Sequence, residues 1–119
     1  MRVYIPTTAS TISQLLLGSA SFDEYLAPEQ FDFVDFDGEV DQEEQEHLVS
    51  QLAAMDSLEL NQGKLALVIA ADLQDEQLNG EAIELKFSQV AALLYSEDGE
   101  ELSWYAPEEI TFKLNELQP

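Results

Sequence analysis

The chain has 119 residues, of which 45% are hydrophobic, and this is enough for one domain with its own core and argues against wholesale disorder. Its 25 acidic residues far exceed its four basic ones, so a formal net charge of −21 disfavours direct binding to nucleic acid or to anionic membranes, whose phosphates would be repelled. The absence of cysteine excludes disulfides and thiolate chemistry.

Residues 2–18 predict a strand followed by a helix. The β-branched and aromatic residues of 2–6 (RVYIP) favour the strand. The helix is expected to begin at Thr7 or Thr8 and to stop at Gly18. The polar, irregular dozen residues that follow predict no regular element.

An acidic segment and the clearest helix come next. Residues 31–36 (FDFVDF) nearly alternate and predict a second strand. The helix is expected from Asp41 to Met55, with Asp41 as its N-cap and Glu44 at the capping-box spacing. Its apolar residues recur at helical spacing, so they are expected to face the core.

The second half of the chain is richer in strands. Residues 65–73 (LALVIAADL) are apolar without alternation, which indicates a central strand covered on both faces. Residues 82–87 (AIELKF) alternate and predict a half-buried strand. Residues 90–95 (VAALLY) and 102–106 (LSWYA) predict a hairpin. A short helix is expected to start at Pro107, and the residues after it fit a strand or a helix equally well.

This order of elements predicts a single domain, residues 1–119, of the α/β or α+β class. Helices between strands imply crossover connections, so a mixed sheet is expected, with a parallel βαβαβ start and antiparallel strands added in the C-terminal half. The predicted core includes Val3, Ile5, Leu48, Leu52, Leu67, Ile69 and Leu85.

Three segments carry a resemblance to a known family: MRVYIPTT at the start, VIAADL in the middle and SWYAPEE near the end. Together they make the chain similar to an uncharacterised actinobacterial family of small acidic proteins, a domain of unknown function. The resemblance spans most of the chain, although this chain is shorter between VAALLY and SWYA. It implies family membership but no activity.

The segment FDFVDFDGEVDQEEQEH (31–47) partly matches a calcium-binding loop of the helix–loop–helix type. With Gly38 at the sixth position of the loop, the first ligand position falls on Phe33, whose side chain has no oxygen. The residues before the loop predict a strand instead of an entering helix. We therefore expect a capped helix start with solvated carboxylates and no bound metal. The calcium loop is kept as an alternative, with the candidate ligands Asp35, Asp37, Asp41 and Glu44.

A second candidate site is the carboxyl edge of the expected parallel sheet. In that arrangement Thr7, Thr8, Asp37 and Asp72 lie together at the edge where open α/β sheets bind ligands. The two aspartates would repel phosphate and no glycine-rich loop is present, so the threonines are expected to act mainly as helix caps. A small-molecule or cation-dependent enzyme or ligand binder at this edge is the alternative function.

Trp104 and Tyr105 are neighbours in a predicted strand, so their side chains point to opposite faces. We expect both side chains to be largely buried. The alternative is that one is in the core and the other, close to Glu108 and Glu109, is exposed and can anchor a basic partner.

No catalytic constellation and no cofactor are predicted. His47, the only histidine, is expected on the surface. The expected function is a non-enzymatic interaction or regulatory module whose acidic face binds a basic protein, and a DNA mimic is a sharper version of it. A poor signal peptide and an apolar run too short to span a membrane predict a cytoplasmic protein.

Overall fold

The main sheet has four antiparallel strands in the order β1-β5-β7-β8, in the computed structural model that describes residues 1–30, 34–35, 38–39, 41–78 and 82–117. Its strands are β1 (Arg2–Thr7), β5 (Ala66–Asp72), β7 (Val90–Ser96) and β8 (Ser103–Tyr105). Two further antiparallel pairs join β2 (Ser19–Phe22) to β6 (Ile83–Lys86) and β3 (Val34–Asp35) to β4 (Gly38–Glu39).

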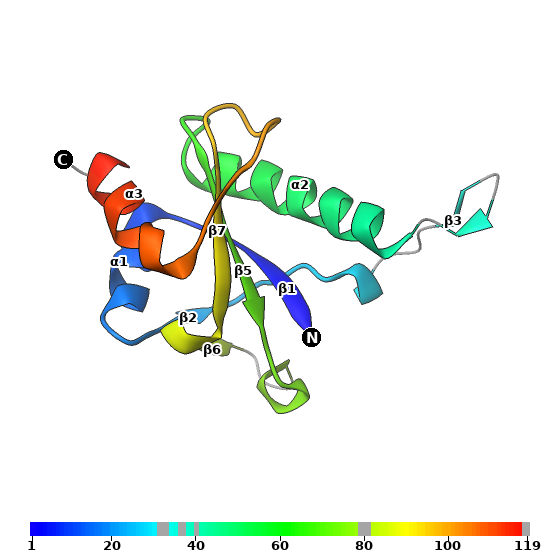
Figure 1. Cartoon of the computed structure of the whole chain (residues 1–119), viewed down its shortest axis with the longest axis horizontal. Helices are drawn as coiled ribbons and strands as arrows, with labels where there is room; N and C mark the ends of the chain where they lie inside the picture. Colours follow the sequence, from blue (N-terminus) through cyan, green and yellow to red (C-terminus); the bar gives the residue numbers. More distant parts are fainter. Residues whose placement is uncertain (31–33, 36–37, 40, 79–81, 118–119) are drawn as a thin grey trace.

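Helices cover both faces of the main sheet, as Figure 1 shows. The long helix α2 (Gln42–Leu60) lies along one face, with the β3–β4 hairpin beyond its N-terminal end. The other face carries α1 (Ala9–Leu16), α3 (Ile110–Leu117) and the β2–β6 pair. Residues 110–117 form a helix, which resolves the ambiguity left by the pattern of this part of the chain.

Two buried clusters follow from this layering. The cluster between α2 and the sheet is built mainly from small residues: Tyr4, Val49, Ala53, Ala54, Ala66, Val68, Ala70, Ala92 and Leu94. The cluster on the opposite face is larger and includes Val3, Ile5, Ile12, Leu15, Phe22, Leu67, Ile69, Ile83, Leu85, Leu93, Ile110 and Leu114. Strand β5 contributes to both clusters, which confirms the prediction that it is central and covered on both faces.

The α+β prediction is confirmed, but the parallel βαβαβ start is wrong. Strand β1 pairs with β5 antiparallel, with Arg2 opposite Asp72 and Thr7 opposite Leu67. The reason is that α1 is not a crossover to a parallel neighbour. The chain leaves α1 through Gly18 and enters β2, a strand that the polar composition of residues 19–30 did not predict, and β2 pairs with β6 outside the main sheet.

The face on which α2 packs also differs from the prediction. Val3, Ile5, Leu67, Ile69 and Leu85 are buried as expected. The prediction that Leu48 and Leu52 are buried is wrong, because their side chains are 37% and 40% exposed. The helix instead buries Val49, Ser50, Ala53, Ala54 and Ser57, whose short side chains match the alanines of β5 and β7.

Both predicted helix caps are present. The Thr8 hydroxyl accepts a hydrogen bond from the Thr11 backbone N–H at 3.3 Å, and Thr8 has the extended backbone of an N-cap. The Asp41 carboxylate accepts from the Glu44 N–H at 2.9 Å. Glu43 and Glu44 occupy the first turn of α2, where the helix dipole favours negative charge.

Candidate functional site

A hollow of about 200 Å³ brings together the chain's only tryptophan, only histidine and only arginine. We call it the indole hollow, and it is lined by Arg2, Tyr4, Glu43, Glu46, His47, Ser50 and Trp104. These residues come from β1, from the first half of α2 and from β8, so the site exists only in the folded chain.

The sheet places the Trp104 indole on the same side as α2. Trp104 pairs with Leu94 across the β7–β8 ladder, and residues directly opposite each other share a face. Leu94 is buried against α2, so Trp104 projects beside that helix, where it is 56% exposed. Between Tyr4 on β1 and this edge, Ala70 and Ala92 project only methyl groups to the same face. These two alanines are buried in the cluster between α2 and the sheet.

Helix α2 supplies the acidic wall of the hollow. Glu43, Glu46, His47 and Ser50 are three or four residues apart and therefore lie on one side of the helix. The Ser50 hydroxyl donates to the backbone carbonyl of His47 at 2.7 Å, so the two residues do not form a serine–imidazole nucleophile pair. His47 is exposed, as predicted.

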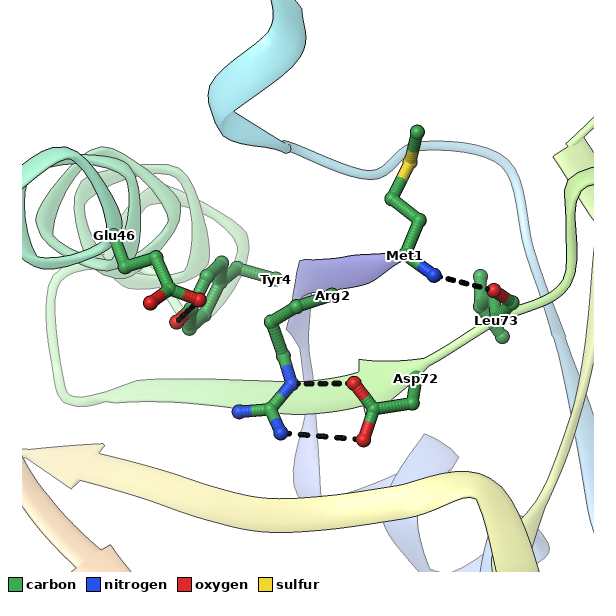
Figure 2. A network of polar contacts seen from close by, with 6 residues as sticks. All are labelled: Met1, Arg2, Tyr4, Glu46, Asp72 and Leu73. Carbon is green, nitrogen blue, oxygen red and sulfur yellow. Dashed lines mark hydrogen bonds and ion pairs between the residues drawn. The ribbon is translucent and has the colours of Figure 1, made fainter. Parts of the chain in front are cut away.

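Arg2 at the rim of the hollow is already engaged, as Figure 2 shows. Its Nε donates to Oδ1 of Asp72 at 2.7 Å and its Nη2 donates to Oδ2 at 3.2 Å. This bidentate pair raises the pKa of Arg2 and lowers the pKa of the Asp72 carboxyl, chiefly through the hydrogen bonds. The Arg2 charge is offset by Asp72 and so is not available to offset the two glutamates. Glu43 and Glu46 therefore remain as the acidic groups of the hollow.

Tyr4 forms the floor of the hollow. Its ring is almost fully buried, and its hydroxyl donates to Oε1 of Glu46 over 3.5 Å (Figure 2). Burial, helped by the nearby Glu46 carboxylate, raises the pKa of the Tyr4 phenol above its ordinary value of 10.0. The folded chain therefore favours the neutral phenol more strongly than the unfolded chain does.

This shift predicts a loss of stability in alkaline solution. A group whose pKa is higher in the folded state contributes stability below its unfolded pKa, and that contribution disappears as the pH rises through the folded pKa. The free energy of unfolding, measured by urea denaturation from pH 8 to pH 11, is expected to decline above about pH 10. Tyr4→Phe should remove part of this decline, whereas the control Tyr25→Phe should retain it. An unchanged profile for Tyr4→Phe would contradict the prediction.

The hollow has the chemistry of a site for a positively charged group. An exposed indole attracts a cation to its ring face, and carboxylates pair with ammonium or guanidinium groups. The protein already uses such a contact elsewhere, because the Lys113 Nζ lies 3.9 Å from the Tyr95 ring centroid and 5.3 Å from that of Tyr105. Lys113 also pairs with Glu116 at 3.3 Å.

The described residues of the predicted sheet-edge site are not brought together as expected. Thr7 and Asp72 lie at opposite ends of the β1–β5 ladder, because the two strands are antiparallel. Thr7 is buried, and Thr8 serves as the cap of α1 and lines a separate cavity of about 350 Å³ with Asp23 and Glu24. Asp37 lies outside the described residues. The shared edge that motivated this site is therefore absent.

The candidate calcium loop is only partly described. The strand pair β3–β4 lies within the candidate loop, and β3 falls inside the segment 31–36 that predicted a strand. Residues 31–33, where the loop begins, lie outside the described residues. Asp41 caps α2 through the Glu44 N–H, and Asp37 lies outside the described residues. Among the residues that the structure describes, no group of three or more histidine, aspartate and glutamate side chains is placed to hold a metal ion.

The aromatic pair points to opposite faces, as predicted. Trp104 is the exposed member, whereas Tyr105 is half-buried against the cluster that lies opposite α2. Glu108 and Glu109 are exposed, and Glu109 Oε1 accepts from the Ala106 N–H at 3.1 Å. Neither glutamate lines the indole hollow. The acids beside Trp104 are instead Glu43 and Glu46, which are distant in sequence and were not predicted to lie there.

No protein-family model, no curated protein and no solved structure matches the chain. The resemblance to the actinobacterial family of small acidic proteins therefore stays a prediction. Within the described part of the chain, no helix combines the length and the apolar character needed to cross a membrane.

Proposed function

We propose that the protein is a non-enzymatic interaction module that binds a basic protein, and that a lysine or arginine side chain of this partner enters the indole hollow. The observation that carries the proposal is the exposed indole of Trp104 beside the carboxylates of Glu43 and Glu46. A cation in this position is attracted both by the ring face and by the carboxylates.

The charge of the whole chain supports the same class of partner. The formal net charge is −21, and the described residues form ion pairs only between Arg2 and Asp72 and between Lys113 and Glu116. An excess of one charge speeds the encounter with a partner of opposite charge and repels nucleic acid. The net charge attracts a partner over a long range, whereas the hollow provides a defined site for one of its cationic side chains.

We also infer that the protein works in the cytoplasm and belongs to the small acidic family that it resembles. The absence of cysteine fits a reducing compartment. The three segments MRVYIPTT, VIAADL and SWYAPEE support the family assignment.

The intrinsic fluorescence of Trp104 provides a direct test, because it is the only tryptophan. A peptide of alternating glycine, serine and lysine, free of aromatic residues, is titrated into the protein in 20 mM salt. We expect a saturable change in Trp104 emission that disappears in high salt. The double variant Glu43→Gln/Glu46→Gln should weaken binding by about threefold to tenfold, a range set by loss of the local ion pairing.

A matched control separates the hollow from the overall charge. Glu108→Gln/Glu109→Gln changes the net charge by the same amount but lies outside the hollow, so its affinity should fall by less than about twofold. Equal losses in the two double variants would show that only net charge attracts the peptide. No binding to the parent protein at low salt would overturn the proposed function itself. Melting temperatures establish that each variant is folded.

A further inference from the structure

The outward side of α2 carries an apolar stripe that no described part of the chain covers. Leu48, Leu52 and Met55 are 37%, 40% and 62% exposed. They are separated by four and three residues, so they line one side of the helix, opposite the small residues that pack on the sheet. We call these three residues the outer seam.

The spacing of the outer seam is the spacing by which one helix packs on another. Apolar residues spaced alternately by three and four positions form the a and d positions of a coiled-coil interface. Isolated exposed leucines are common on protein surfaces, but a continuous stripe of large apolar side chains is typical of an interaction surface. Three residues provide a short contact, which suits a transient complex better than a permanent dimer.

The charges beside the outer seam decide what occupies it. Glu44, Asp56 and Glu59 are exposed around the stripe, and α2 contains no lysine or arginine. A second copy of the chain would place these acidic side chains against their own equivalents, at a net charge of −21 per copy. A partner helix with an apolar stripe flanked by lysines or arginines can pack on the outer seam and pair its basic side chains with these carboxylates.

We propose that the outer seam is the docking surface for an amphipathic basic helix of the partner protein. This inference rests on the proposed function, because it specifies the form of the basic partner. The outer seam and the indole hollow lie on different sides of α2, because Ser50 of the hollow is on the side that packs on the sheet. Each surface can therefore be altered without the other.

The test uses a fluorescein-labelled peptide of 18 residues, made only of leucine and lysine, with its leucines at helical spacing. A second peptide has the same composition in an order that spreads the leucines around the helix. Fluorescence anisotropy at 50 mM salt is expected to show binding of the amphipathic peptide that is about tenfold tighter than binding of the scrambled one.

Leu52→Gln should weaken binding of the amphipathic peptide by about tenfold and leave binding of the scrambled peptide unchanged. The substitution removes the central apolar side chain of the outer seam but changes no charge. Leu60→Gln is the matched control, since Leu60 is 57% exposed on the same helix but is turned away from the seam by helical periodicity. Its effect should stay below about twofold. Met55→Gln provides a second seam variant if Leu52→Gln has an altered melting temperature.

The outcomes separate this inference from the proposed function. Equal binding of the two peptides, with no effect of Leu52→Gln, would show that charge alone attracts them, which overturns the docking surface but not the basic partner. Failure of both peptides to bind would overturn both proposals. The remaining possible occupant is a second copy of the chain, which sedimentation equilibrium in 1 M salt tests. A dimer that dissociates in the Leu52→Gln variant would show that the outer seam binds a second copy instead.

Discussion

Replacing Ile69 with alanine should lower the free energy of unfolding by roughly 2–5 kcal/mol. Ile69 lies at the centre of β5, is 1% exposed, and is paired with Ile5 on β1 and Leu93 on β7. All three residues belong to the buried cluster on the face opposite α2. The neighbouring side chains are held by strands on both sides, so they cannot collapse fully into the space that the lost methyl groups leave.

Urea denaturation measures this loss, and Leu52→Ala serves as its control. Leu52 is 40% exposed on α2, so its truncation removes less apolar burial and leaves no enclosed cavity. We expect it to cost less than about 1 kcal/mol. Comparable losses in the two variants would mean that α2 packs on the sheet through its leucines, which would contradict the observed burial of Val49, Ala53 and Ala54.

The strands were the most predictable part of this fold, because the burial pattern of a strand follows from its own local sequence. The unbroken apolar run of residues 65–73 predicted a central strand, and β5 is covered on both faces. The alternation in residues 82–87 predicted that Ile83 and Leu85 are buried, as they are in β6. Pairing is less local. Strand β2 was missed because its residues are small or polar apart from Phe22, so the alternation is weak in the sequence.

Helix α2 shows why an apolar stripe does not identify a buried face by itself. The prediction centred the buried face on the large residues Leu48 and Leu52, with Val49 and Ala53 only widening it. A helix that lies across alanine-rich strands needs short side chains to approach them, so Ala53, Ala54 and Ser57 form the contact. The alanines of residues 65–73 were the signal for this close packing, but their significance depends on which strand the helix crosses.

The indole hollow could not be predicted for a topological reason. Its residues come from the two edge strands of the main sheet and from the helix that crosses between them, and the expected parallel arrangement would have placed them differently. The expectation that Trp104 and Tyr105 are both largely buried was wrong for Trp104, which is exposed. The identity of its acidic neighbours depends on the antiparallel order β1-β5-β7-β8, which no local pattern contains.

Ser57→Ala is expected to cost roughly 1–3 kcal/mol, because it leaves a buried backbone donor without a partner. The Ser57 side chain is buried within the α2 contact, where its hydroxyl donates to the Thr7 carbonyl at 2.9 Å and accepts from the Leu67 N–H at 2.7 Å. Thr7 and Leu67 are opposite each other at the end of the β1–β5 ladder. One hydroxyl therefore joins α2 to both strands.

The alanine variant affects the two strands unequally, and this difference makes the prediction specific. The Thr7 carbonyl still accepts from Asn61 Nδ2 at 3.1 Å, whereas the hydroxyl is the acceptor for the Leu67 N–H. Ser50→Ala is the matched control, because Ser50 is equally buried on α2 but its hydroxyl donates to the His47 carbonyl of the same helix. We expect that control to cost less than about 1 kcal/mol in urea denaturation. Hydrogen exchange should be faster at the Leu67 amide in Ser57→Ala than in Ser50→Ala. Equal stability losses and equal exchange rates would mean that the end of the sheet does not depend on the Ser57 hydroxyl.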